Sequence, residues 1–355
     1  MKVLIDGLSL QQSLGVRRYT NSLIESYIRR YGKGNVMVII PEETGEEFYN
    51  YILYKNKYRF FINFFVFHRF VRKLDFDIFH APANTSHCFK IKGKFYVTTM
   101  HDIMYKVVPS FYSSNCIINF LKIRLLDLYT YFTLKNSDLV ISISETTKND
   151  LLEHFKTDSV IIPNGIVKLP ESKKDEKDCL RNYGLTPKSY FLYVGSDKRH
   201  KNVDFLIKSF LAAKTDKKLV LCGFRRNGYT NYKGRISFTG HITDSELAQL
   251  YMNTEAFVFP SLYEGFGLPV LEALQYGVKV FSSNGGALKE FPSEVVSFFD
   301  PTNENELISL LENPGEYELD INIINDFLQQ YSWDKLLDRL QDIVEASYKK
   351  HRVIQ

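Results

Sequence analysis

The sequence carries no large excess of charge of one sign, few cysteines and no long hydrophobic run. Its 355 residues hold 45 lysines and arginines against 41 aspartates and glutamates, and the net charge of +4 is too small to indicate nucleic-acid binding. The four cysteines, at positions 88, 116, 179 and 222, show neither a CxxC pair nor metal-ligand spacing, so we expect no disulfide framework and no zinc site. No stretch approaches the roughly 20 apolar residues that cross a bilayer.

Two further absences narrow the class of protein. The opening segment MKVLIDGLSL turns acidic after three apolar residues and lacks the apolar core of a signal peptide, so it is predicted to be a first strand. No G-x-G-x-x-G follows that strand, which argues against a dinucleotide-dependent oxidoreductase. Together with the scattered cysteines, these absences favour a protein of the reducing cytosol.

What the sequence does contain is a regular alternation of short apolar runs and longer helical stretches. The runs are rich in β-branched and aromatic residues and end in small or polar ones, as strands of a buried parallel sheet do. The predicted strands lie at residues 2–7, 36–40, 76–81, 94–102 and 138–144, and again at 190–196, 217–223, 235–240, 256–261 and 278–283. The pattern predicts an α/β protein with two doubly wound halves.

A charged stretch with little apolar periodicity separates the halves. It predicts a linker over residues 171–187, between a first domain at 1–170 and a second at 188–335. Apolar residues at helical spacing predict a C-terminal amphipathic helix over about 336–355. Ligands of such sheets bind outside the carboxyl ends of the strands, so we expect the ligand of this chain in a cleft between the halves.

The segment PSLYEGFGLPVLEALQYG places two glutamates around a predicted helix start. Glu264 precedes a Gly-Phe-Gly turn, and Glu272 lies about one turn inside a mostly apolar helix that Pro269 begins. A carboxylate among apolar neighbours is unfavourable unless something satisfies it. The residues alone leave two alternatives, an internal salt bridge or cap, and a pair of acids that bind a polyhydroxylated ligand.

Residues 236–291, which contain this segment, closely resemble the signature region of the retaining family-four glycosyltransferases of the GT-B fold. The first half agrees more loosely: GVRRYTNSL resembles the family's glycine loop, TMHD its His-Asp element, and YVGSDKRHKN its phosphate-binding loop. The matches follow the family's order over nearly the whole chain. The resemblance implies a GT-B fold, with two Rossmann-like domains facing a cleft and the C-terminal helix packed back on the first domain.

The resemblance also implies roles for residues of the second half. Glu272 would hold the ribose of a sugar nucleotide, Glu264 the hydroxyls of the donor sugar, and Lys201 the diphosphate. A carboxylate accepts two hydrogen bonds from a vicinal diol, and a lysine offsets charge on a departing phosphate. The remaining expected donor-binding residues of this half are Gly195, Ser196, Arg199, Gly223, Gly265, Phe266, Gly267 and Leu268.

This loop departs from the family pattern at two positions. Ser196 stands where many relatives have an arginine, and His200 stands beside Lys201 where others have one. Arg199 is therefore a weaker candidate than Lys201. The alternative for Arg199 and Lys198 is solvated surface charge.

In the first half the resemblance points to His101, Asp102, Gly15 and Val16. The family's histidine lies against the donor sugar, which implies the same for His101, whereas a cap and a satisfied polar group is the alternative for His101 and Asp102. For Asp102 two roles remain open, orienting His101 or binding the acceptor. The amide of Gly15 is expected near the phosphate or sugar. Arg17 and Arg18 are candidates for contact with a phosphate of the acceptor, and a position on the helix surface without such a contact is the alternative.

No metal and no cofactor other than the nucleoside diphosphate sugar donor is expected. Residues 75–77 spell D-x-D, which is a metal motif in the other major glycosyltransferase fold, but here the motif opens a predicted strand. Charge on the leaving group is better met by Lys201 and the amides of a helix N-terminus.

Residues 51–74 hold nine aromatic residues, six lysines or arginines and no acid. Aromatic rings at a bilayer interface combined with cations at anionic headgroups favour contact with a membrane surface, and a core helix with a basic edge is the alternative. A second aromatic run at residues 111–132 follows the His-Asp element. Together they suggest a lipid-linked acceptor handled by a peripheral protein at the cytoplasmic face of a membrane.

The function predicted from the sequence is retaining, metal-independent transfer of a hexose, mannose-like by resemblance, to a hydroxyl of a saccharide acceptor. A growing lipid-linked bacterial polysaccharide is the expected acceptor. The rival is a non-catalytic GT-B partner of an active transferase, against which the joint presence of His101, Lys201, Glu264 and Glu272 argues. The donor base (UDP, GDP, dTDP or ADP) and the oligomeric state are left open, and no nucleic-acid partner is expected.

Overall fold

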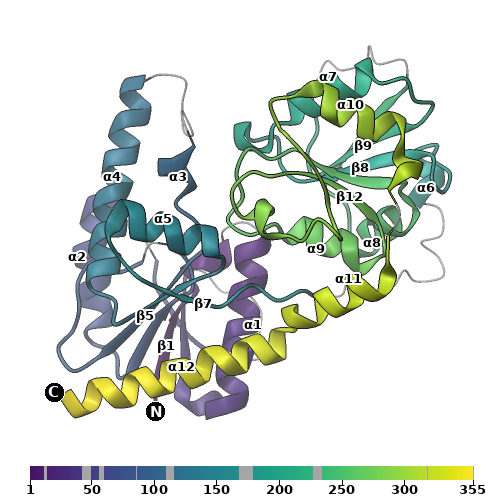
Figure 1. Ribbon diagram of the computed structural model, residues 1–355. Helices are drawn as coiled ribbons and strands as arrows, with labels where there is room; N and C mark the ends of the chain where they lie inside the picture. The colour runs from purple at the N-terminus through teal and green to yellow at the C-terminus, as the bar shows by residue number, and fades with distance from the viewer. Residues whose placement is uncertain are drawn as a thin grey trace. The chain divides into compact units, whose positions relative to one another are not determined.

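The chain divides into two compact units (Figure 1), namely unit 1 (Met1–Gly165 with Tyr331–Gln355) and unit 2 (Ile166–Gln330). The computed structural model describes residues 1–11, 14–41, 49–55, 60–84, 86–108, 116–167, 179–226, 234–317 and 319–354, without the side chains of 14, 60–64 and 354. The predicted linker at 171–187 lies outside the described residues as far as 178, and the short helix α6 (Cys179–Asn182) follows.

Unit 1 is built on a seven-stranded parallel sheet in the order β3-β2-β1-β4-β5-β6-β7. Its strands are β1 (Val3–Asp6), β2 (Val36–Ile40), β3 (Asn50–Leu53), β4 (Ile78–Ala81), β5 (Phe95–Met100), β6 (Leu139–Ser142) and β7 (Val160–Ile161). The strand order reverses between β1 and β4, and ligands of open α/β sheets bind at such a reversal.

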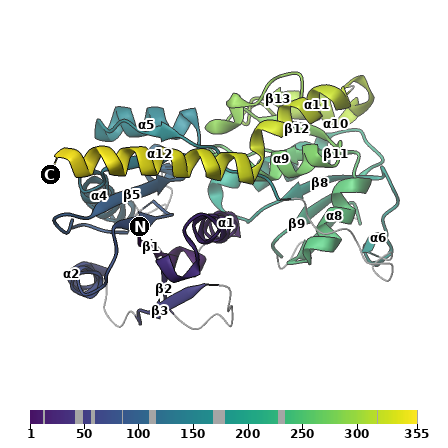
Figure 2. The ribbon, with the colours of Figure 1, turned by 90° about the horizontal axis from the view of Figure 1, so that it is seen from below.

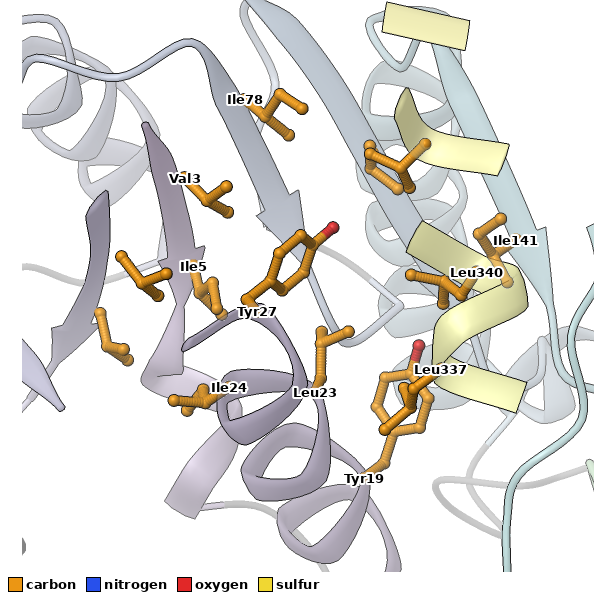
Figure 3. Packing of buried hydrophobic residues seen from close by; sticks show 14 of the residues in the cluster. Val3, Ile5, Tyr19, Leu23, Ile24, Tyr27, Ile78, Ile141, Leu337 and Leu340 are labelled. Carbon is orange, nitrogen blue, oxygen red and sulfur yellow. The ribbon is translucent and has the colours of Figure 1, made fainter. Parts of the chain in front are cut away.

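Helices cover both faces of this sheet. Val3 and Ile5 point to the face that α1 (Leu14–Tyr31) and α12 (Trp333–Ile354) cover, and Leu4 points to the other. Figure 3 shows Leu337 and Leu340 of α12 beside Tyr19 of α1 in the first of these cores. Figure 2 shows α2 and α4 on the opposite side of the strands from α1. The helices of that second face are α2 (Phe60–Val71), α3 (Met104–Val107), α4 (Cys116–Lys135) and α5 (Glu145–Phe155).

Unit 2 is built on a six-stranded parallel sheet in the order β10-β9-β8-β11-β12-β13, which reverses between β8 and β11. The strands are β8 (Tyr190–Val194), β9 (Lys218–Cys222), β10 (Ile236–Gly240), β11 (Ala256–Phe259), β12 (Lys279–Ser283) and β13 (Ser297–Phe299). The helices after α6 are α7 (Val203–Ala212), α8 (Asp244–Asn253), α9 (Leu268–Gln275), α10 (Glu304–Glu312) and α11 (Ile321–Leu328). Short 3-10 turns are η1 (Gly7–Gln11), η2 (Lys33–Asn35), η4 (Arg199–Lys201), η5 (Ala287–Glu290), η6 (Pro314–Glu316) and η7 (Gln329–Tyr331).

The two parallel-sheet units confirm the predicted fold class, and the ten predicted strands are all present. The predicted C-terminal helix is also confirmed, because α12 buries Leu336, Leu337, Leu340 and Val344 in the core of unit 1. Three strands, β3, β7 and β13, were not predicted.

The aromatic stretch at residues 51–74 is not one helix. Its first residues belong to β3, residues 56–59 lie outside the described part, and α2 begins at Phe60. Phe67 and Val71 are buried against the sheet, whereas Phe65 is 63% exposed. The stretch is therefore partly core. In the part of the chain that the structure describes, no helix is both long enough and apolar enough to span a bilayer.

Candidate functional site

The carboxyl end of β8 in unit 2 is folded tightly against the end of β9. Gly223 has a φ of 106°, and a Cβ there would lie 2.4 Å from the carbonyl oxygen of Gly195. A side chain on Gly195 would meet the hydroxyl of Tyr193 at 2.5 Å, and that hydroxyl donates to the carbonyl of Ser196 at 2.9 Å. A side chain on Gly223 would therefore collide with the backbone of Gly195, and one on Gly195 would displace the Tyr193 ring.

Arg226 holds the same loop to the helix that follows it. Its Nε donates to Asp197 at 2.6 Å, a second nitrogen also contacts Asp197, and Nη1 donates to Asp204 in the first turn of α7 at 2.5 Å. Charge-assisted pairs of this bidentate kind fix geometry as well as contribute energy. Arg226 was not selected from the sequence, in which only its position shortly after a predicted strand end distinguishes it.

Lys201 and Glu264 come together at the reversal of strand order in unit 2. Lys201 ends η4, after β8, and Glu264 follows β11, and their Nζ and Oε1 atoms lie 2.6 Å apart. The two side chains are only 14% and 12% exposed, and Nζ also lies 4.8 Å from the centre of the Phe259 ring. Two residues predicted to contact the donor thus form a shielded ion pair, in which Glu264 uses one of the three N–H groups of Lys201.

The neighbours of Lys201 in η4 differ in exposure. His200 is buried, its backbone carbonyl accepts from Leu262 N–H at 2.7 Å, and burial lowers its pKa to about 4 against a smaller opposing effect of Glu264. His200 is thus neutral near pH 7 and anchors η4 to the loop after β11. Arg199 and Lys198 are exposed.

The loop that carries Glu264 rests on the glycines after β12. Glu264 forms a bridge with Gly286, and its carbonyl accepts from Ala287 N–H at 2.8 Å. A Cβ on Gly286, whose φ is 63°, would lie 2.4 Å from that same carbonyl oxygen. Glycine is therefore required here, and the SNGG segment at 283–286 positions Glu264. This supporting role was not predicted, although the glycine pair after a strand was visible.

The Gly265-Phe266-Gly267 turn leads into α9 as predicted. Gly267 is the N-cap residue, with a φ of 106°, Leu268 begins the helix, and a proline occupies its first turn. Glu272, the fifth residue of α9, is 7% exposed, and its Oε2 accepts from the hydroxyl of Tyr251 at 3.3 Å. The carboxylate is thus held from α8, by a residue that the sequence did not single out.

In unit 1, His101 follows β5 and is oriented by a loop after β4. Its Nε2 donates to the carbonyl of Pro82 at 2.8 Å, and its backbone N–H donates to Asn84 at 2.6 Å. His101 is 7% exposed, and burial lowers its pKa to about 4, with the Pro82 bond opposing the shift. The ring is therefore neutral at pH 7, and with the proton on Nε2 its Nδ1 is a hydrogen-bond acceptor.

Asp102 and the start of α1 lie around this histidine. Asp102 Oδ1 accepts from Met104 N–H at 3.0 Å, at the entry to α3, so part of the predicted alternative, a cap, is observed. Tyr19 packs edge-on against His101, with ring centres 5.0 Å apart, and so connects His101 to α1, whose first turn holds Gly15 and Val16. Arg17 is exposed and donates from Nε to the carbonyl of Leu10 at 2.7 Å.

The acids of the D-x-D segment serve the start of the sheet. Asp77 accepts from the backbone N–H of Lys2 at 2.8 Å, and Asp75, 74% exposed, pairs with the Lys2 side chain at 2.5 Å. Within the described ranges, no three His, Cys, Asp or Glu side chains lie together in a way that would hold a metal ion.

Two protein-family models match the chain. The model "Glycosyltransferase Family 4" matches residues 15–167, and the model "Glycosyl transferases group 1" matches residues 180–318. The first falls in unit 1 and the second in unit 2, and together they cover most of the chain.

Curated relatives and solved structures agree with the models. The chain is 27% identical over 233 residues to the O-antigen chain mannosyltransferase B of Escherichia coli, covering 60% of this chain and 59% of that protein. It is 26% identical over 252 residues to the O-antigen chain mannosyltransferase RfbU of Salmonella typhimurium, covering 67% and 66%. It thus spans between about three-fifths and two-thirds of the length of these relatives. The structure of Anabaena Alr3699/HepE in complex with UDP-glucose superposes with a TM-score of 0.72 at 15% identity, over 98% of this chain and 100% of that one.

Proposed function

Since the chain belongs to the family-four glycosyltransferases of the GT-B fold, we propose that it transfers a hexose from a nucleoside diphosphate sugar to a hydroxyl of a saccharide acceptor, with retention of anomeric configuration. The observation that carries the proposal is the shielded Lys201–Glu264 pair at the strand reversal of unit 2, the place where open α/β sheets bind ligands. A structural ion pair needs no glycine loops around it, and this pair lies between two.

In this proposal unit 2 binds the donor. The two remaining N–H groups of Lys201 serve the diphosphate, with backbone amides of the Gly265–Leu268 turn at the N-terminus of α9. Gly195, Ser196 and Gly223 let the phosphates approach the backbone, and Glu264 and Glu272 accept hydrogen bonds from the sugar and ribose hydroxyls, respectively. Arg199, which is exposed, is the most peripheral of the proposed contacts.

The chemistry follows from these roles. As the bond between the anomeric carbon and the phosphate oxygen breaks, negative charge grows on the diphosphate, and a pre-placed lysine and helix amides stabilise it. The departing oxygen takes the proton of the acceptor hydroxyl, which attacks from the same face. His101, neutral and fixed by Pro82, contributes an acceptor nitrogen for a hydroxyl of the donor sugar, and Gly15, Val16 and Asp102 complete the proposed unit 1 contribution. No metal ion is required by this arrangement of charges.

The relatives guide the choice of sugar and acceptor. Both curated relatives above are O-antigen chain mannosyltransferases, so we propose mannose as the transferred hexose, GDP-mannose as the first donor to test, and a lipid-linked saccharide of a bacterial surface polysaccharide as the acceptor. Such an acceptor places the enzyme at the cytoplasmic face of a membrane, as a peripheral protein.

The test of donor binding is thermal unfolding of the purified chain with UDP, GDP, dTDP and ADP. A nucleotide that binds the native state raises the unfolding temperature according to its concentration and Kd. We expect GDP to raise it most, and Glu272→Gln to abolish that rise. Glu294→Gln, which changes an exposed glutamate of the same unit, is the matched control and is expected to keep it.

Two results would overturn these assignments. If none of the four nucleotides shifts unfolding, the donor proposal is wrong, and if Glu272→Gln binds as tightly as the parent, the ribose assignment is wrong. Retention is tested separately, by the anomeric configuration of the product in its NMR spectrum. An inverted product contradicts it.

A further inference from the structure

We propose that one face of α4 in unit 1 docks on an anionic lipid bilayer. A regular stripe of residues along this helix points to solvent, and it is made of apolar and basic side chains. The inference rests on the proposed function in one respect, since an acceptor carried on a lipid lies at a membrane surface. It assigns that contact to α4, which overlaps the second aromatic run at residues 111–132, rather than mainly to residues 51–74.

The stripe follows the helical repeat. Steps of four and three residues place its members on one face of an α-helix. They are Ile117, Leu121, Arg124, Leu128, Tyr131 and Lys135, all exposed. The exposed fractions of the four apolar members are 72%, 61%, 48% and 46%, in chain order, and the adjacent Ile118 and Phe120 are 47% and 55% exposed. Scattered exposed apolar residues need no explanation, but a contiguous row marks an interaction surface.

The opposite face of α4 already has its partners. Tyr129, Thr130, Thr133 and Leu134 are buried, and Leu134 packs with Met100 and Leu151 in the core under α4 and α5. The exposed apolar row is therefore not the side that folds α4 onto the sheet, and burial within unit 1 does not account for it.

The charges of α4 are sorted by face. The guanidinium of Arg124 lies 5.1 Å from the Phe120 ring centre, and the Lys135 ammonium lies 5.6 Å from that of Tyr131. Asp127, the single acid of α4, is turned inward and pairs with Lys106 at 2.8 Å, with 17% of its side chain exposed. The exposed stripe thus combines rings and aliphatic chains with cations and has no acid.

This composition fits an anionic bilayer better than a second protein. Rings and aliphatic chains enter the boundary between headgroups and acyl chains, while Lys and Arg meet lipid phosphates. In contrast, the core of a protein interface is depleted of charge, and a two-fold contact through this stripe would bring cations of two copies together without an acid between them. Because α4 is not a membrane-spanning helix, the contact is in the plane of the surface.

A second element of unit 1 extends the surface. Phe65 of α2 is exposed and packs on Phe89, with ring centres 5.2 Å apart, and the end of α4 is tied to the same loop by Asn136, which donates to the Cys88 carbonyl at 3.0 Å. Both helices cover the same face of the sheet (Figure 2). The exposed cations Arg69, Arg72 and Lys73 of α2 and its C-terminal end add to the positive charge.

The experiment is co-sedimentation of the full chain with vesicles of phosphatidylcholine alone and of phosphatidylcholine mixed with phosphatidylglycerol. We expect binding to the mixed vesicles, at least ten-fold weaker binding for L121Q/L128Q, and about five-fold weaker binding for Arg124→Ala, at about 1 kcal/mol per cation near an anionic surface. The control L152Q/M252Q changes two residues of similar exposure, 47% and 45%, on other helices, and is expected to bind like the parent.

Each alternative outcome overturns the proposal. If the parent does not bind mixed vesicles, or if L121Q/L128Q binds as well as the control, the assignment to α4 is wrong. If light scattering shows a dimer that L121Q/L128Q dissociates, the stripe binds a second copy instead. The nucleotide-dependent shift in unfolding temperature, measured on the same variants, reports on the proposed function separately, because the stripe does not belong to the proposed donor site.

Discussion

The ion pair between Lys201 and Glu264 is the most informative single contact of unit 2. Exposed ion pairs contribute little to stability, whereas removing one partner of a shielded pair strongly destabilises the protein. Both side chains are less than one-sixth exposed, so a change at either should alter folding as well as chemistry. The two effects can be separated by removing both charges together.

We expect Lys201→Met to lower kcat/KM about 100-fold or more, because it removes the cation that is proposed to face the leaving phosphate. It should also lower the free energy of unfolding by roughly 3 kcal/mol, because Glu264 keeps a shielded charge without its partner. The double variant K201M/E264Q should regain most of that stability and none of the activity. Initial rates and thermal unfolding measure the two quantities.

The pair between Lys208 and Glu304 is a matched control, since it has the same 2.6 Å separation in the same unit but side chains 72% and 33% exposed. K208M/E304Q and its single variants should leave both rate and stability nearly unchanged. A double variant K201M/E264Q that recovers activity together with stability would show that the pair is only structural.

Sequence reasoning placed the candidate site residues correctly relative to the strands and missed the side chains that hold them. Glu264, Lys201 and His101 could be placed at strand ends because a strand is a local pattern of apolar residues. Tyr251 beside Glu272 and Asn84 beside His101 are contacts between distant segments, which no local pattern encodes. The partners of a functional residue therefore required the fold.

At the scale of elements, strands with a strong local pattern of apolar residues were predicted, and strands without one were missed. The three unpredicted strands, β3, β7 and β13, are all edge strands, whereas the ten predicted strands include every interior one. An edge strand has one neighbour and less burial, so it needs no long apolar run: β7 has two residues and β13 has three.

The contact between Gly286 and the backbone of Glu264 gives a prediction about the loop after β12. Gly286→Ala should lower the free energy of unfolding by about 2 kcal/mol or more, because its left-handed φ is strained for alanine and the new Cβ meets the Glu264 backbone. It should also weaken nucleotide binding, because Glu264 leads directly into the Gly265–Leu268 turn and pairs with Lys201, which are the groups proposed to bind the diphosphate. Thermal unfolding with and without nucleotide measures both effects.

Gly34→Ala is the control for this change, since a Cβ at Gly34 meets nothing within 4 Å. It is expected to change stability by no more than about 0.5 kcal/mol. Equal stability of the two variants would mean that the β12 loop gives way easily and does not position Glu264.

At the scale of the molecule, the first unit is completed by the last helix of the chain. Leu340 of α12 is fully buried with Leu23, Leu337 and other residues of the core in Figure 3. Arg29 and Arg30 of α1 add ion pairs to Asp334, Asp342 and Glu345 of α12. The stability of unit 1 therefore depends on residues that follow unit 2 in the sequence.

We expect Leu340→Ala to destabilise unit 1 by roughly 3 kcal/mol, through lost burial and the cavity it leaves. The single tryptophan of the sequence, Trp333, packs on Tyr19 in unit 1, so its fluorescence reports unfolding of that unit. Because the proposed nucleotide contacts of unit 2 are untouched, the variant should still bind nucleotide. Arg339→Ala, at an exposed position of α12, should leave the fluorescence transition unchanged. A Leu340→Ala transition at the parent's position would contradict the role of α12.

The contact between Gly165 and Trp333 concerns the two points at which the chain passes from one unit to the other. Gly165 is the last residue of unit 1 before unit 2, Trp333 lies just after the return, and a Cβ on Gly165 would touch the indole at 2.4 Å. The two crossing points are thus adjacent within unit 1. Unit 2 is therefore an insertion in the chain of unit 1, and it begins and ends at neighbouring points. A chimaera that replaces unit 2 with the corresponding unit of a relative needs only two neighbouring junctions, and it would test whether this unit sets the sugar preference.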